Sequence, residues 1–95
     1  MEQILSNSSF DLFTETNTFK PVAHLGICKL SEQKIILLEH TWVDPQKRHQ
    51  GWAEKLLTAF IQVSEFQEFK ILPLCPYAKF FFSQHPEFKH HLINQ

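Results

Sequence analysis

Residues 34–53, which read KIILLEHTWVDPQKRHQGWA, decide the fold. Branched and aromatic residues dominate Lys34–Val43, a pattern typical of a strand that is covered on both faces. Pro45 ends this strand, because proline has no amide hydrogen for the next rung of a ladder. A polar loop follows, and apolar residues at helical spacing begin at Trp52. The stretch therefore predicts a strand–loop–helix unit.

Alternation along this central strand assigns its side chains to two faces. The even-numbered residues, His40 among them, are expected on one face, and the odd-numbered residues, Thr41 among them, on the other. The neighbouring strand at 21–30 carries Gly26, where we expect an irregularity such as a bulge. A tight polar turn at 31–33 predicts that these two strands form an antiparallel hairpin.

The rest of the chain predicts shorter elements around this unit. The expected elements are strands at 10–15, 21–30, 34–43 and 69–74 and helices at 52–66 and 77–85. This order predicts an α/β (α+β-like) domain with a mixed, mostly antiparallel sheet, a strand–loop–helix–strand core and a short C-terminal helix. No linker or repeat divides the chain, so residues 1–95 are expected to form one domain.

Composition excludes several classes of function. The 95 residues are 43% hydrophobic and carry a formal net charge of -1, which argues against a nucleic-acid partner. The apolar stretches are too short to span a membrane, and the first residues do not resemble a signal peptide. The cysteines, Cys28 and Cys75, are therefore expected to stay reduced in the cytoplasm.

The start of the predicted helix is a candidate anion site. Unpaired amides and the helix dipole give such a start a partial positive charge. Gly51 would let the backbone approach a bulky anion, and Lys47 and Arg48 add cationic side chains. The alternative is a solvated basic loop in which the glycine serves only the turn.

His40 and Cys75 form a second candidate site. His40 is on the strand at 34–43, and Cys75 is at the end of the following strand. If these strands are parallel neighbours, their carboxyl ends lie side by side, which is where ligands often bind in α/β sheets. An imidazole can activate a thiol, so we expect Cys75 to be accessible and Cys28 to be shielded within its strand. The alternative is a buried cysteine that only packs and a histidine with one local hydrogen bond.

Two further groups of residues suggest weaker alternatives. His85, His90 and His91 lack the spacing of a metal site, so we expect no metal and exposed imidazoles near the terminus. The phenylalanines at 80–82 could form an interaction surface, although a short helix with one or two of these rings in the core is the simpler interpretation.

The segments HTWVDPQKRHQGWAEKLL and KILPLCPYAKFFFSQHPEF together resemble the GNAT superfamily of N-acetyltransferases, and more closely its short Yjdj-type subgroup. The superfamily's coenzyme A loop reads Q/R-x-x-G-x-G/A, and residues 48–53 (RHQGWA) fit each defined position. The likeness extends from about Val22 to Phe88. His49 is a departure, because the subgroup usually has glycine there. Trp42 is another, since relatives often carry a carboxylate or other residue at that position.

The resemblance implies a site for acetyl-coenzyme A. It places the pyrophosphate of coenzyme A at the loop residues Arg48, His49, Gln50, Gly51, Trp52 and Ala53. It places the pantetheine arm beside Thr41, Trp42 and Val43, where the strand splays from the next one. It also places Cys75 in the active-site cleft with His40 near it.

We therefore expect an acetyl-coenzyme A-dependent N-acetyltransferase that transfers acetyl directly to an unidentified amine, on a small molecule or a protein lysine. His40 would accept the proton of the amine, and Cys75 would donate a proton to the leaving thiolate or serve as a nucleophile. The alternatives are a non-catalytic coenzyme A or acyl-coenzyme A binding module and a protein-interaction domain. A monomer or weak dimer is expected.

Overall fold

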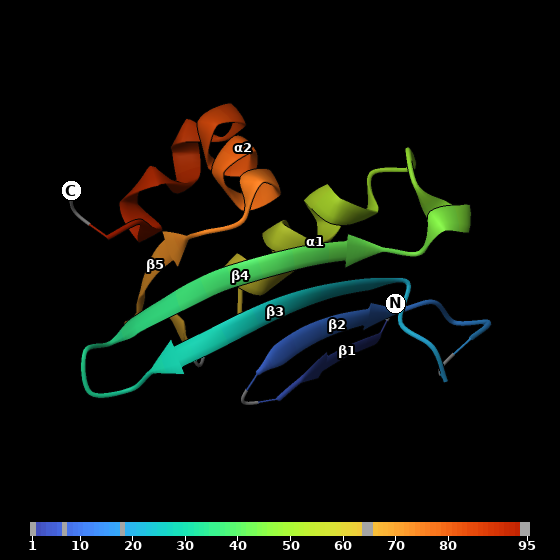
Figure 1. Cartoon of the computed structure of the whole chain (residues 1–95), viewed down its shortest axis with the longest axis horizontal. Helices are drawn as coiled ribbons and strands as arrows, with labels where there is room; N and C mark the ends of the chain where they lie inside the picture. The colour runs from blue at the N-terminus through green and yellow to red at the C-terminus, as the bar shows by residue number, and fades with distance from the viewer. Residues whose placement is uncertain (1, 7, 18, 64–65, 94–95) are drawn as a thin grey trace.

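The computed structural model describes residues 2–6, 8–17, 19–63 and 66–93. Its elements in chain order are β1 (Glu2–Leu5), β2 (Ser9–Phe13), β3 (Ala23–Leu30), β4 (Ile35–Val43), η1 (Pro45–Lys47), α1 (Trp52–Ile61), β5 (Lys70–Pro73), α2 (Pro76–Gln84) and η3 (Pro86–His91). The strands form one sheet in the order β1-β2-β3-β4-β5 (Figure 1). Only β4 and β5 are parallel, so the predicted mixed, mostly antiparallel sheet is confirmed.

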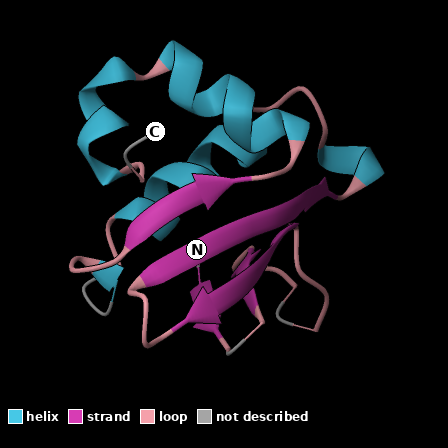
Figure 2. Cartoon of the chain, turned by 60° about the vertical axis from the view of Figure 1, so that its left-hand side comes forward, coloured by secondary structure: helices cyan, strands magenta, loops and turns pink. Residues whose placement is uncertain are grey.

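The core lies between one face of the sheet and the helices, which gather on that side (Figure 2). Leu56 and Phe60 of α1 and Phe81 of α2 are almost fully buried against the sheet residues Leu25 and Leu38. Buried residues recur every three or four positions in the helices and at alternate positions in the strands, which is the pattern that favours each kind of element. The opposite face of the sheet carries no helix in the described part of the chain.

Two elements differ from the sequence-based prediction. β1 was not predicted, because four residues at a sheet edge give too little periodicity to distinguish a strand. The helix α1 ends at Ile61 rather than near Phe66. The side-chain amide of Gln67 donates hydrogen bonds to the carbonyls of Ile61 (2.9 Å) and Val63 (3.1 Å), which satisfies acceptors left free at the helix end.

A bulge divides β4 into two halves. Ile27 pairs with Leu38, but the preceding residue Gly26 pairs with His40, so Glu39 has no partner on β3. The expected irregularity at Gly26 is therefore confirmed, and the extra residue lies on the facing strand. A bulge of this kind shifts the alternation of the strand by one residue.

The bulge corrects the predicted faces of β4. Before it, Leu38 points into the core; after it, Thr41 and Val43 do, because they pair with the buried residues Leu25 and Ala23. His40 consequently lies on the opposite, uncovered face. The prediction that His40 and Leu38 share a face was wrong, since strict alternation does not hold across an inserted residue.

β4 and β5 separate at the bulge. Their pairing extends only as far as Leu38 and Pro73, and the amides of Leu74 and Cys75 both donate to the carbonyl of Leu38, at 2.9 and 3.2 Å. Beyond this point β4 continues to Val43 without β5 beside it (Figure 1). The backbone edge of the second half of β4 therefore faces a cleft, as the family resemblance implies.

Gly26 leaves space beside the bulge that a larger residue would fill. A Cβ atom there would stand 2.1 Å from Cε1 of His40, whose ring covers the glycine. We expect Gly26→Ala to lower the free energy of unfolding by about 1–3 kcal/mol, because the ring must be displaced. Denaturant titration of the single variant and of Gly26→Ala/His40→Ala measures this. The double variant should regain most of the loss, and equal stability of the single variant and the parent protein would contradict the packing.

Candidate active site

The start of α1 presents unpaired amides to the cleft. Gly51 precedes the helix with a φ of 80° and provides no side-chain cap. The first intrahelical hydrogen bond runs from the amide of Lys55 to the carbonyl of Gly51, at 3.0 Å. The amides of residues 52–54 therefore have no partner within the helix, and a Cβ at Gly51 would meet no atom within 4 Å. This open, positively polarised backbone can accept an anion.

Local contacts shape the loop before the helix. The carboxylate of Asp44 accepts a hydrogen bond from the amide of Gln46 at 3.0 Å, which starts the turn η1. Nε of Arg48 donates to the carbonyl of Val43 at 3.2 Å, so this cation is tied to the end of β4. His49 has a φ of 65°, in the left-handed region that favours glycine.

A cavity of about 450 Å³ joins the loop to the end of β4. It is lined by Thr41, Trp42, Val43, Arg48, His49, Gly51, Trp52, Ala53, Glu54 and Tyr77. All the cofactor-binding residues predicted from the sequence except Gln50 thus line one cavity. The structure adds Glu54 and Tyr77, to which sequence reasoning had assigned no role. The adjacency of Glu54 to the loop motif and of Tyr77 to Cys75 was the only available signal.

Tyr77 and Glu54 connect the two helices beside the cavity. Burial, followed by the nearby carboxylate of Glu54, raises the pKa of Tyr77 above its ordinary value. Glu54 also lies 3.3 Å from Nε2 of His85, at the end of α2. A tyrosine phenol is protonated at neutral pH, so the position of Tyr77 in the wall allows it to donate a proton into this cavity, although the raised pKa makes it a weaker acid.

Cys75 caps the N-terminus of α2. Its Sγ accepts a hydrogen bond from the amide of Ala78 at 3.3 Å and lies 3.3 Å from Oγ1 of Thr41. Only 7% of Cys75 is exposed, whereas Cys28 is half-buried. The expectation that Cys75 is the accessible thiol and Cys28 the shielded one was therefore wrong. Cys75 lies buried at the start of α2, whereas no helix of the described ranges covers the sheet face to which Cys28 belongs.

His40 and Cys75 do not meet. Nε2 of His40 lies 3.2 Å from Nε2 of His24, and Nδ1 of His24 lies 2.5 Å from Oδ1 of Asp11. These contacts lie on the sheet face away from the helices, whereas Cys75 contacts Thr41 on the helix side. The expected pairing of the imidazole with the thiol was wrong, because the bulge turns His40 away.

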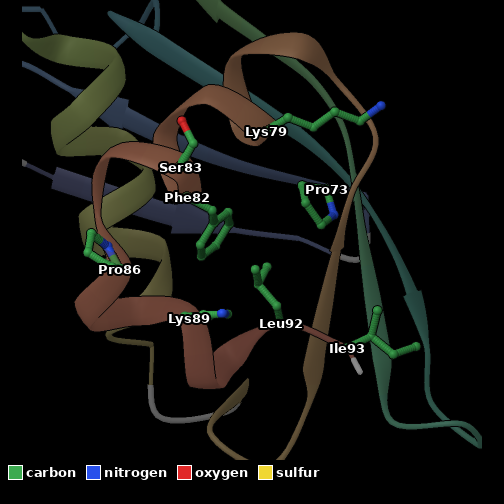
Figure 3. Close-up of a pocket in the computed structure, with 8 residues that line it drawn as sticks. All are labelled: Pro73, Lys79, Phe82, Ser83, Pro86, Lys89, Leu92 and Ile93. Carbon is green, nitrogen blue, oxygen red and sulfur yellow. The ribbon is translucent and has the colours of Figure 1, made fainter. Parts of the chain in front are cut away.

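A larger cavity of about 690 Å³ lies on another side of α2 (Figure 3). It is lined by Pro73, Lys79, Phe82, Ser83, Pro86, Lys89, Leu92 and Ile93. It contains neither a residue of the 48–53 loop nor any group of the predicted site. Phe82 forms part of its wall. Of the three neighbouring phenylalanines, Phe81 and Phe82 are buried and Phe80 alone is strongly exposed. This agrees with the expectation that one or two of these rings lie in the core.

Comparison with known proteins identifies the family of this chain. The model of the GCN5-related N-acetyltransferase family matches residues 14–92. The chain belongs to this family. A search of the curated proteins found no match. An NMR structure of a GCN5-like protein from Staphylococcus aureus is similar, with a TM-score of 0.71 and 21% identity over 99% of this chain and 89% of that one.

The fold of the chain, a mixed and mostly antiparallel sheet with helices on one face, therefore agrees with its family. Neither comparison distinguishes subgroups, so the Yjdj-type assignment stays a prediction. Within the described residues, no group of three or more His, Cys, Asp or Glu side chains could hold a metal ion. His90 is exposed, whereas His85 and His91 are half-buried rather than exposed as expected. No helix in the described ranges is long and apolar enough to cross a membrane.

The left-handed backbone at His49 leads to a stability prediction. A residue with a Cβ in this conformation destabilises the folded state by about 1–2 kcal/mol. Replacement by glycine removes this strain, but part of the gain in stability is lost because glycine also gives the unfolded chain more conformational freedom. We expect His49→Gly to raise the free energy of unfolding by about 1 kcal/mol, as measured by denaturant titration. Gln50→Gly is the control and should destabilise, because Gln50 does not have a positive φ. A loss of stability in His49→Gly would contradict the strain.

Proposed function

We propose that this N-acetyltransferase-family protein transfers the acetyl group of acetyl-coenzyme A directly to an amine. The observation that carries the proposal is the single cavity that joins the free amides of α1 to the unpaired edge of β4. A pyrophosphate fits at the amides, because Gly51 leaves open space where a side chain would stand. When bound, acetyl-coenzyme A supplies an activated thioester at the far end of this cavity.

The group that accepts a proton and the groups that donate one lie on opposite sides of β4. The unpaired backbone edge of β4 beyond Leu38 can polarise a carbonyl oxygen through its amides. His40 is exposed on the uncovered face and serves as the base that takes the proton of the amine. Cys75 and Tyr77 lie on the helix side, where a thiolate would leave. A base and an acid on opposite sides suit direct transfer, in which both substrates are bound at once.

Between the two roles that the sequence left open for Cys75, burial favours proton donation. A nucleophile needs an open approach to its sulfur, whereas Cys75 is covered and contacts Thr41 and the amide of Ala78. Thr41 lines the cavity and links Cys75 to it. Tyr77 lines the cavity directly and is the second donor.

The loop has a direct test. We expect Gly51→Val to weaken coenzyme A binding by roughly tenfold or more, because a branched side chain obstructs amide–phosphate hydrogen bonds worth about 1.5–3 kcal/mol each. Isothermal titration calorimetry of the folded variant measures the affinity. Pantetheine, which lacks the pyrophosphate, is the matched control ligand and should bind both proteins equally. An equal loss for both ligands would place the defect outside the phosphate contacts.

The proton donor has its own test, with turnover measured over a panel of amines. We expect Tyr77→Phe or Cys75→Ser to lower kcat by roughly a hundredfold, because loss of general-acid catalysis has effects of this size. KM for acetyl-coenzyme A should change little, since the proton is transferred only in the transition state. The variant with the larger effect identifies the donor. Tight coenzyme A binding without turnover of any amine by the parent protein would instead support a non-catalytic binding module.

A further inference from the structure

We propose that Asp11 and His24 are positioning residues that fix the tautomer of His40 and form a proton relay behind it. The proposal rests on the proposed role of His40 as the base for the amine. Asp11 is on β2, His24 on β3 and His40 on β4, so three adjacent strands each contribute one member. The sheet register brings them near one another. Asp11 pairs with His24, and His40 pairs with Gly26, two residues along β3 from His24, so His40 is the diagonal neighbour of His24 on the same face.

The hydrogen-bonding partners dictate where the protons lie. An ionised carboxylate can only accept, so Nδ1 of His24, 2.5 Å from Oδ1 of Asp11, carries a hydrogen and donates. Nε2 of a neutral His24 is then an acceptor, and Nε2 of His40 at 3.2 Å must be the donor. A neutral His40 with its hydrogen on Nε2 has a free lone pair on Nδ1. That nitrogen is the one available to take a proton from an amine.

The surroundings hold this arrangement in place. The ring of His40 rests over Gly26, where any Cβ would collide with it, and its centroid lies 5.1 Å from that of His24. The side chains of His24 and Asp11 are only 30% and 18% exposed. Partial burial strengthens the attraction between a carboxylate and an imidazolium relative to open water. His40 itself is exposed, so its Nδ1 remains open to a substrate.

The relay moves two protons, and no group is oxidised or reduced. An N–H bond of the ammonium form of the acceptor breaks and an Nδ1–H bond forms on His40. The Nε2–H bond of His40 breaks and an Nε2–H bond forms on His24. The positive charge therefore ends on His24, beside the carboxylate of Asp11, and His40 is again neutral. The neutral amine is left free to attack the thioester carbonyl.

The first test is spectroscopic and requires no turnover. Ring ¹⁵N chemical shifts of His40 in the intact protein, recorded where the imidazole is neutral, should show the hydrogen on Nε2. His24→Ala should lower the share of the Nε2–H form to that of a free imidazole, which is a mixture that itself favours Nε2–H, whereas His24→Gln should retain the higher share of the parent protein, because a side-chain carbonyl can accept from Nε2 of His40. A parent protein with the hydrogen on Nδ1, or with no more of the Nε2–H form than a free imidazole has, overturns the proposal even if no variant folds.

The second test is kinetic and uses folded variants with an amine that the parent protein acetylates. We expect His24→Ala and Asp11→Asn to lower kcat by at least about tenfold with KM for acetyl-coenzyme A unchanged. His24→Gln should recover part of the loss, because it restores the tautomer but cannot hold the second proton. His90→Gln and Glu32→Gln make the same chemical changes at exposed positions outside the relay and should leave kcat unchanged. Full activity of His24→Ala overturns the relay.

The two tests separate this inference from the proposed function. If the parent protein binds coenzyme A but acetylates no amine, the proposed function fails, and the His40 tautomer still decides whether Asp11 and His24 position the ring. If the parent protein is active and His24→Ala is equally active, the relay fails and the acetyltransferase function stands.

Discussion

The single residue inserted into β4 at Glu39 is the constraint on which the site depends. Because Gly26 pairs with His40 and Ile27 with Leu38, the strand changes faces at this point. Thr41 is turned toward the helices and Cys75, and His40 is turned toward His24. The parallel pairing with β5 also stops at Leu38, so one local irregularity coincides with both the division of faces and the opening of the cleft.

The loop after β4 uses backbone conformations that most residues avoid. Gly51 adopts its left-handed φ at no steric cost, whereas His49 adopts a similar φ despite its Cβ. Strain of this kind persists only where the surrounding contacts hold the chain, and here Arg48 ties the loop to the end of β4. The result is a helix start whose amides face a cavity instead of being capped by a side chain. The proposed binding of the coenzyme A pyrophosphate gives a reason for the strained backbone and the uncapped helix start, because both leave the amides open to an anion.

The sheet separates two chemical environments that lie close together along the chain. On the helix side, covered groups such as Cys75 and Tyr77 suit proton donation to a leaving group. On the uncovered side, the chain of Asp11, His24 and His40 suits proton acceptance from an incoming amine. A single strand can contribute side chains to both environments, because neighbouring side chains point to opposite faces of the sheet. In the proposed reaction, the acceptor would approach from this side, which no described helix covers.

The sequence by itself determined the central strand, the loop and the start of α1, because Pro45 and Gly51 mark their boundaries and the apolar periodicities are strong. Through the resemblance of the 48–53 loop to the GNAT superfamily, the sequence also pointed to nearly all residues of the cavity, most of which are neighbours in the chain. It did not reveal that His40 contacts His24 instead of Cys75, nor that Cys75 is covered. Those facts depend on strand register and on where α2 packs, and both are set by contacts between segments far apart in sequence, which local patterns do not encode.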